Sequence, residues 1–171
     1  ADAYGARANL NFTIINDGST DDSNKLGAIG DLHLVIQREK IDDDLIVVAG
    51  DNLFSQPLAE FGKFCREKNA PVLGVYDVGS LDQARKYGVV ALDSAGKLSQ
   101  FIEKPAQPAS TLIGIALYYY PKSVLPLISQ YVAAGNNPDQ PGRLIQWLYP
   151  KVRSEERRRG KDGKSRWAAA H

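Results

Sequence analysis

Short apolar runs alternate along the chain with segments in which apolar residues recur every three or four positions. The runs are typical of buried strands and the recurrences of amphipathic helices. The central run is LIVVA at residues 45–49, which three aspartates precede and the turn residues Gly50, Asp51 and Asn52 follow. An uninterrupted run of this kind predicts a strand covered on both faces, as in the middle of a parallel sheet.

The same patterns predict the remaining elements. Further strands are expected at residues 10–15, 72–76, 87–92, 97–102 and 112–120. Helices are expected at residues 29–37, 56–68, 80–85, 124–131 and 144–148, the last ended by Pro150. Because strand, helix and strand follow one another over residues 45–76, a right-handed parallel crossover is expected. The chain is thus predicted to be an α/β protein.

Composition narrows the class of protein. The chain has 171 residues, of which 43% are hydrophobic and 24% charged, as in one soluble globular domain. No apolar run reaches the length of a membrane span, and no signal peptide is recognised. The single cysteine, Cys65, excludes an internal disulfide and favours the cytoplasm. It is expected to be buried on the apolar face of its helix.

Charge divides the chain unevenly. Residues 151–166 carry eight basic and three acidic residues, whereas residues 1–150 have a net charge of −4. The body therefore offers no basic face for nucleic acid. The expected division is a packed domain at residues 1–150 and a basic, disordered tail at residues 151–171.

Polar residues follow two of the predicted strands. Asp51 and Asn52 come directly after the central strand, where ligands of open α/β sheets collect, so they are placed to hold a divalent cation. An ordinary turn or a helix cap is the alternative reading. Glu103 and Lys104 close another strand, and a lysine there suits a phosphate while a glutamate suits hydroxyl groups. The alternative is a solvated ion pair.

Five segments together resemble the sugar nucleotidyltransferase family, which includes glucose-1-phosphate thymidylyltransferase. They are LGAIGDL, LIVVAGDNLF, KYGVVALDSAGKLSQFIEKP, STLIGIALYYYP and DQPGRLIQWLY, and the resemblance extends over residues 16–149. It implies an α/β, Rossmann-like, mainly parallel (mixed) sheet flanked by helices and incomplete at the N-terminus. It also implies a reaction of a nucleoside triphosphate with a sugar 1-phosphate that yields a nucleotide sugar and pyrophosphate.

The resemblance also implies roles for individual residues. Asp51 is similar to the family's Mg²⁺-binding aspartate, and Lys104 to the lysine that contacts the sugar phosphate, so both are the catalytic candidates. Glu103 matches the glutamate that accepts hydrogen bonds from sugar hydroxyls. The other substrate-binding candidates are Gly27 near the nucleobase, Asn52 beside the metal ligand, and Gly88 and Gly114 beside the sugar.

Two family features have no counterpart in this sequence. Nothing before Leu10 resembles the glycine-rich loop that holds the triphosphate, and Trp167 is followed by alanines instead of a second metal-binding aspartate. The chain is therefore expected to be a fragment that is inactive alone. A non-catalytic domain of the same fold that binds a nucleotide sugar or regulates a partner is the alternative, and an unrelated doubly wound domain is a third. Nucleobase, sugar and homo-oligomeric assembly of a full-length protein stay open.

Overall fold

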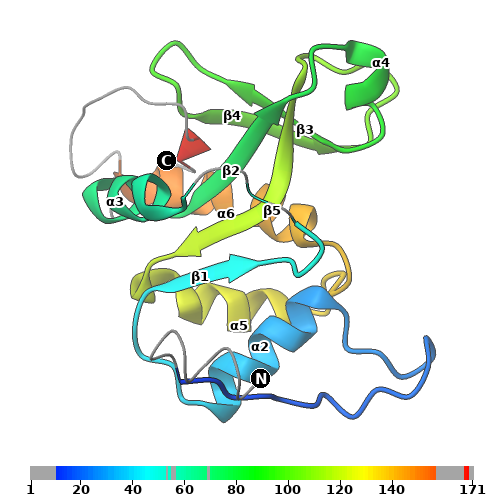
Figure 1. The fold of residues 1–171 in the computed structure, drawn as a ribbon, viewed down its shortest axis with the longest axis vertical. Coiled ribbons are helices and arrows are strands. Elements are labelled where there is room, and N and C mark those ends of the chain that lie inside the picture. The colour runs from blue at the N-terminus through cyan, green and yellow to red at the C-terminus, as the bar shows by residue number, and fades with distance from the viewer. Residues whose placement is uncertain (1–10, 53, 55–56, 69, 157–167, 170–171) are drawn as a thin grey trace.

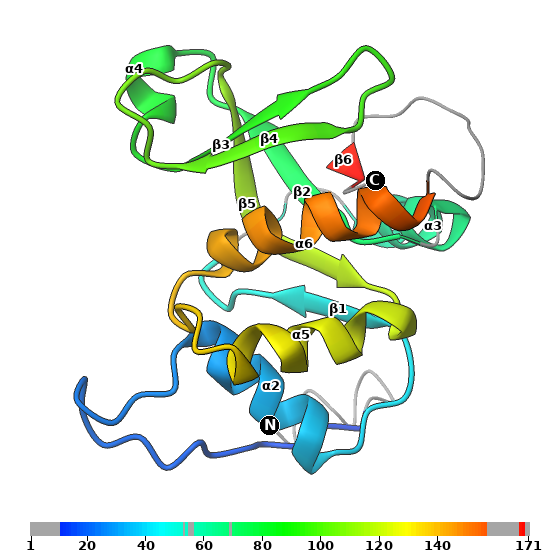
Figure 2. The same cartoon turned by 180° about the vertical axis from the view of Figure 1, so that it is seen from behind.

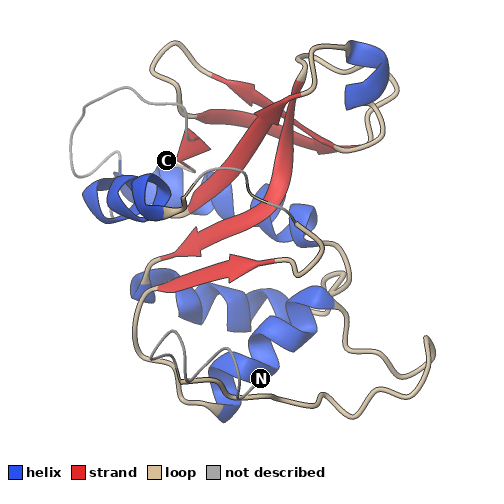
Figure 3. Cartoon of the chain, viewed as in Figure 1, coloured by secondary structure: helices blue, strands red, loops and turns tan. Residues whose placement is uncertain are grey.

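The computed structural model describes residues 11–156 apart from residues 53, 55, 56 and 69, together with residues 168–169. Figure 3 shows its helices and strands. The helices are α2 (Ala28–Arg38), α3 (Ala59–Lys68), α4 (Leu81–Ala84), the 3₁₀ turn η1 (Lys122–Val124), α5 (Leu125–Ala133) and α6 (Pro141–Glu156). The strands are β1 (Leu45–Val48), β2 (Val72–Asp77), β3 (Gly88–Leu92), β4 (Leu98–Glu103), β5 (Leu112–Tyr120) and β6 (Ala168–Ala169). Among the described residues, no helix is both long and apolar enough to cross a bilayer.

Strand β5 lies at the centre of the sheet. Along one edge it pairs with β2, from Leu112 opposite Asp77 to Tyr119 opposite Val72. Its C-terminal half also pairs with β1, and Ile113 pairs with Val89 of β3. The β3–β4 hairpin continues the sheet beyond that point, and β6 pairs with β2.

The α/β class is confirmed. The expectation that neighbouring strands pair mainly in parallel is wrong. Every pairing among the described residues is antiparallel. The predicted β1-α3-β2 unit does have its two strands in the same direction, since each runs antiparallel to β5. They are not neighbours, however, because β5 lies between them. The run of β-forming residues at 112–120 does not indicate the direction of the strand or its place in the sheet.

Alternate side chains of β5 face two different sets of helices. Leu117 and Tyr119 pack against α3 in a group we term the α3 cluster, with Phe61, Phe64, Cys65 and Val72. Tyr118 and Tyr120 point to the opposite face, where residues of α2, α5 and α6 form the larger core. Figures 1 and 2 show α3 and α6 on opposite sides of β2. This two-sided burial follows from the period of two along a strand.

Strand β1 is covered on one face only, contrary to prediction. Leu45 and Val47 pack against the larger core, whereas Ile46 and Val48 are 50% and 43% exposed. The reason is that α5 covers one side of β1 while α3 lies over β2 and β5. An apolar run therefore predicts a strand here, but it does not show which of its faces are covered.

The ends of the chain differ from expectation as well. Residues 11–15 form no strand, and Phe12 and Ile14 are 56% and 83% exposed. Helix α6 does not end at Pro150 but continues to Glu156, with Val152 buried against the core. A proline within a helix removes one backbone hydrogen bond, which this burial offsets. The rest of the predicted tail, except β6, lies outside the described residues.

The predicted burial of Cys65 is confirmed. Its side chain is 1% exposed within the α3 cluster, and burial raises the pKa of its thiol to about 12.

The difference in burial between Leu117 on β5 and Ile46 on β1 predicts a difference in stability. We expect Leu117→Ala to lower the free energy of unfolding by about 2–5 kcal/mol, because it opens a cavity beside α3 in a fully buried site. The control Ile46→Ala lies on the paired strand but at a half-exposed position, and should cost about 1 kcal/mol or less. Urea unfolding followed by circular dichroism measures both. Equal losses would show that the exposed face of β1 is covered in solution.

Candidate functional site

A pocket of about 400 Å³ opens between the β3–β4 hairpin, β5 and the start of α6. The hairpin and the residues that flank it contribute Lys86, Tyr87, Gly88, Phe101, Glu103 and Lys104. Strand β5 contributes Gly114, Ala116 and Tyr118, and the segment entering α6 contributes Asp139, Gln140, Pro141 and Gly142. The structure thus brings four of the predicted site residues together: Gly88, Glu103, Lys104 and Gly114.

The hairpin places two of these residues opposite each other. Gly88 begins β3 and Glu103 ends β4, and they are partners in the antiparallel ladder. The predicted Asp93–Gly96 loop closes the far end, where the Asp93 N–H donates to the Lys97 carbonyl at 2.8 Å. At the pocket end the Lys104 N–H donates to the Tyr87 carbonyl at 3.0 Å. The register of the β3–β4 hairpin therefore brings Glu103 and Lys104 to the same end of the pocket.

The wall of the pocket depends on small residues along β5. Gly114, Ala116, Tyr118 and Tyr120 share one face of the strand, and their side chains lengthen toward the core. A Cβ on Gly114 would lie 3.0 Å from the Phe101 ring, and one on Gly88 would lie 2.4 Å from it. Glycine at these two positions leaves room for Phe101, which is 6% exposed and forms part of the pocket lining.

Tyr118 is the polar group at the inner end of this wall. Burial, with a smaller contribution from the negative charge of Glu103, raises the pKa of its hydroxyl to about 12. The hydroxyl therefore keeps its proton at neutral pH and can donate a hydrogen bond.

Lys104 has an unusual backbone conformation. Its φ is 45°, in the left-handed region that non-glycine residues enter at a cost of about 1–2 kcal/mol. Its side chain is exposed at the pocket mouth, and its backbone N–H is held by the Tyr87 carbonyl. A strained lysine that lines a pocket is typical of residues retained for binding.

Asp51 and Asn52 adjoin the pocket without lining it. The Asn52 amide nitrogen donates to the Ala116 carbonyl at 3.2 Å, and the Ala49 N–H donates to the same oxygen at 3.0 Å. The turn after β1 is thus fastened to the strand that forms the pocket wall. Asp51 is exposed in this turn, and no group of three potential metal ligands occurs among the described residues.

This arrangement fits Mg²⁺ held in part by a substrate. Mg²⁺ commonly binds through one or two protein carboxylates, substrate phosphates and water. Asp51 offers one such carboxylate next to the pocket wall, and the hydrogen bond from the Asn52 amide nitrogen to Ala116 uses only one end of that side-chain amide.

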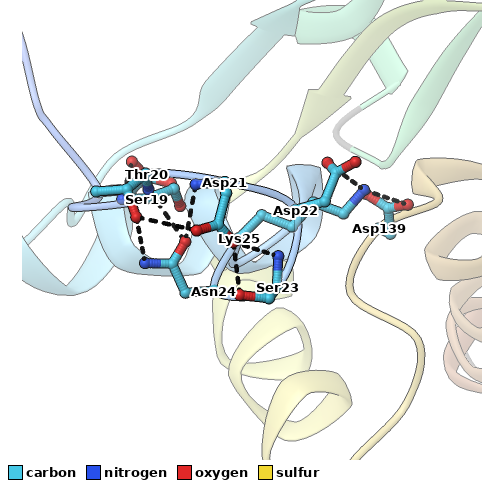
Figure 4. A network of polar contacts seen from close by, with 9 residues as sticks. Ser19, Thr20, Asp21, Asp22, Ser23, Asn24, Lys25 and Asp139 are labelled. Atoms are coloured by element: carbon cyan, nitrogen blue, oxygen red, sulfur yellow. Dashed lines mark hydrogen bonds and ion pairs between the residues drawn. The ribbon is translucent and has the colours of Figure 1, made fainter.

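Gly27 lies behind the pocket instead of lining it. It precedes α2 with a φ of 77°, and a Cβ there would lie 2.8 Å from the Pro138 carbonyl oxygen and from the Cα of Asp139. The Ile29 N–H donates to that Pro138 carbonyl at 2.7 Å. Lys25 adds an exposed ion pair to Asp139 at 3.6 Å, which Figure 4 shows beside the hydrogen-bonded loop of residues 19–24. The entrance of α2 therefore supports the loop that supplies Asp139 to the pocket.

The sequence did not single out Phe101, Tyr118 or residues 139–142. Phe101 could have been found, because it lies two positions before Glu103 on the same strand and so on the same face. The DQPG segment is present in the family resemblance, but nothing in its composition indicates that it turns toward the β3–β4 hairpin.

Comparisons with known proteins agree on one family. A family model described as nucleotidyl transferase matches residues 3–158. A UTP–glucose-1-phosphate uridylyltransferase, AglF of Haloferax volcanii, is 30% identical over 53% of this chain and 37% of its own length. The enzyme of the same name from Synechocystis is 31% identical over 74% of this chain and 31% of its own length. The chain thus spans about a third of these curated relatives.

A solved structure agrees with the fold. It is from Bacillus anthracis, was assigned as a glucose-1-phosphate thymidylyltransferase and contains sucrose. It has a TM-score of 0.63 and 21% identity, over 86% of this chain and 57% of the other. The likeness confirms the Rossmann-like fold expected from the sequence.

The conformation of Lys104 makes a prediction that needs no ligand. Lys104→Gly should be more stable than Lys104→Ala by about 1 kcal/mol, because alanine retains the Cβ that opposes a φ of 45°. Urea unfolding of the two variants measures the difference. Lys40, at a φ of 51° after α2, offers the same pair of substitutions away from the pocket. Equal stability of the pair at position 104 would contradict the left-handed backbone there.

Proposed function

Because the chain belongs to the nucleotidyl transferase family, we propose that its pocket binds a sugar 1-phosphate for transfer to a nucleotide. The reaction joins the sugar phosphate to a nucleoside triphosphate and releases pyrophosphate. One observation carries the proposal. The residues that the family resemblance assigns to the sugar side meet around one cavity: Gly88, Glu103 and Gly114 lie on three different strands, and Lys104 directly follows β4.

The chemistry of the lining suits such a ligand. Lys104 supplies a positive charge at the mouth for the phosphate, and Glu103 supplies acceptor oxygens for sugar hydroxyls. Tyr118 can add a hydroxyl donor from the inner wall. Gly88 and Gly114 leave room for the Phe101 ring, which gives the pocket an apolar wall for the sugar to lie against.

In the proposed reaction an oxygen of the sugar phosphate attacks the α-phosphorus of the triphosphate. The bond between the α-phosphorus and the oxygen that bridges it to the β-phosphate breaks, and pyrophosphate leaves. Catalysis of this kind rests on positioning and on charge neutralisation. Lys104 holds the attacking phosphate, while Glu103 orients the sugar that carries it.

The nucleotide is proposed to lie toward the turn after β1 and the entrance of α2. Asp51 would hold Mg²⁺, which when bound neutralises charge on the phosphate oxygens. Asn52 keeps that turn against β5, and Gly27 is proposed to lie on the nucleobase side. Thymidine triphosphate with glucose 1-phosphate is the pair we propose, and the names of the curated relatives make UTP the first competitor to test.

The sugar phosphate site can be tested by binding. Lys104→Ala should weaken the affinity for glucose 1-phosphate by about 1.5–3 kcal/mol, the usual worth of a charge-assisted hydrogen bond. Chemical-shift changes in NMR titrations measure weak binding of this kind. Lys63→Ala removes an exposed lysine from α3 on the other face of the sheet and serves as the matched control. Equal affinity of the two variants would remove Lys104 from the site.

Turnover gives a second test. We expect the 171-residue polypeptide to release no detectable pyrophosphate from glucose 1-phosphate, Mg²⁺ and any common nucleoside triphosphate. The triphosphate needs several preorganised N–H groups and cations, and loss of one such group typically costs about a hundredfold to a thousandfold in rate. Asp51 supplies one carboxylate, and no glycine-rich phosphate loop is recognised in these residues.

The control is a version extended with the family's N-terminal strand and loop and with a second metal-binding aspartate. It should turn over, and Asp51→Asn should abolish its activity. Turnover by the 171-residue polypeptide itself, abolished by Asp51→Asn, would contradict the expected inactivity. If neither version releases pyrophosphate, a non-catalytic domain that binds nucleotide sugars is favoured.

A further inference from the structure

We infer that Gly142 is a positioning residue of the pocket, whose missing side chain fixes the carboxylate of Glu103 for the sugar. The inference rests on the proposed function, because it concerns how the same pocket holds its ligand. Neither the sequence patterns nor the family resemblance assigned Gly142 a role.

Gly142 lies in the first turn of α6 and is buried. A Cβ added to it would lie 2.7 Å from the Glu103 Oε2 atom and 2.7 Å and 2.9 Å from two carbons of the Phe101 ring. Atoms do not approach a Cβ so closely without a shift. Any side chain at position 142 would therefore displace the carboxylate, the ring or the helix.

The backbone does not explain the glycine. Its φ is not among the positive values of the chain, and it occupies a regular helix. Alanine is the better helix former at such a position, so the helix alone would favour alanine. The contact with Glu103 and Phe101 is the feature of this site that requires glycine.

The helix cannot easily move away to make room. One turn further along α6, the Gln146 side-chain amide donates to the backbone carbonyl of Phe101 at 2.9 Å. Positions 142 and 146 lie on the same face of a helix, so both hold α6 against β4 at Phe101. The ring of Phe101 is itself 6% exposed and enclosed by Gly88 and Gly114. The carboxylate of Glu103 is the part of this contact with room to move.

This packing places the Glu103 carboxylate between two glycines, Gly88 and Gly142. Its Oε2 atom is 3.1 Å from the position of a Gly88 Cβ and 2.7 Å from that of a Gly142 Cβ. The first turn of α6 also favours a negative charge near it. Gly142 thus keeps Glu103 in the pocket wall, with its acceptor oxygens held for sugar hydroxyls.

The test uses the full chain, with glucose 1-phosphate as the probe. Gly142→Ala should weaken binding at least about tenfold, as expected when a charged hydrogen-bond partner is displaced. Gly62→Ala is the matched control, because Gly62 also lies in a helix, α3, and its added Cβ would meet, within the described part of the chain, only Arg66 at 3.6 Å. NMR titration gives the affinities, and thermal unfolding gives the stability of each variant.

A double mutant separates positioning from general destabilisation. If Gly142 acts through Glu103, Gly142→Ala combined with Glu103→Gln should bind within about twofold of Glu103→Gln alone, since coupled sites are not additive. Binding by Gly142→Ala within about twofold of wild type, or full additivity in the double mutant, would overturn the inference while the proposed function stands. Failure of the folded wild-type chain to bind glucose 1-phosphate would instead overturn the proposed function, and this inference with it.

Discussion

Hydrogen bonding along both edges of β5 is the constraint on which the rest of the structure depends. Its ladder with β2 fills one edge, and β1 and β3 share the other. With both edges occupied, its side chains must alternate between two helical layers. On one face this alternation places the short residues Gly114 and Ala116 before the long Tyr118. The strand that organises the core therefore also leaves the space that forms the pocket.

Local patterns were sufficient to predict most elements of this fold. The helix at Ala28–Arg38, the β3–β4 hairpin and β5 lie where periodicity and turn residues indicate them, because each depends on residues close in sequence. What failed depends on distant partners. The antiparallel pairings follow from the insertion of β5 between β1 and β2, and the exposed face of β1 follows from the position of α3. Burial of Val152 likewise extends α6 beyond Pro150.

The candidate site divides in the same way. Glu103, Lys104 and Gly88 could be named because a hairpin brings them together within a short stretch, and Gly114 because the resemblance extends into β5. Gly142 could not, since its importance lies in a contact with Glu103 across 39 positions of the chain that only the docking of α6 creates. The roles of Asp51, Asn52 and Gly27 stay proposals, as they adjoin the pocket without lining it.

The burial of Cys65 provides an internal probe of folding. It is the only cysteine in the chain, and its thiol is closed off between α3 and the sheet with its pKa raised to about 12. The thiolate is the nucleophile that attacks thiol reagents, so in the native state Cys65 is protected both by its burial and by its protonation. Its rate of labelling therefore reports how often α3 separates from β2 and β5, on the side of the sheet away from the pocket.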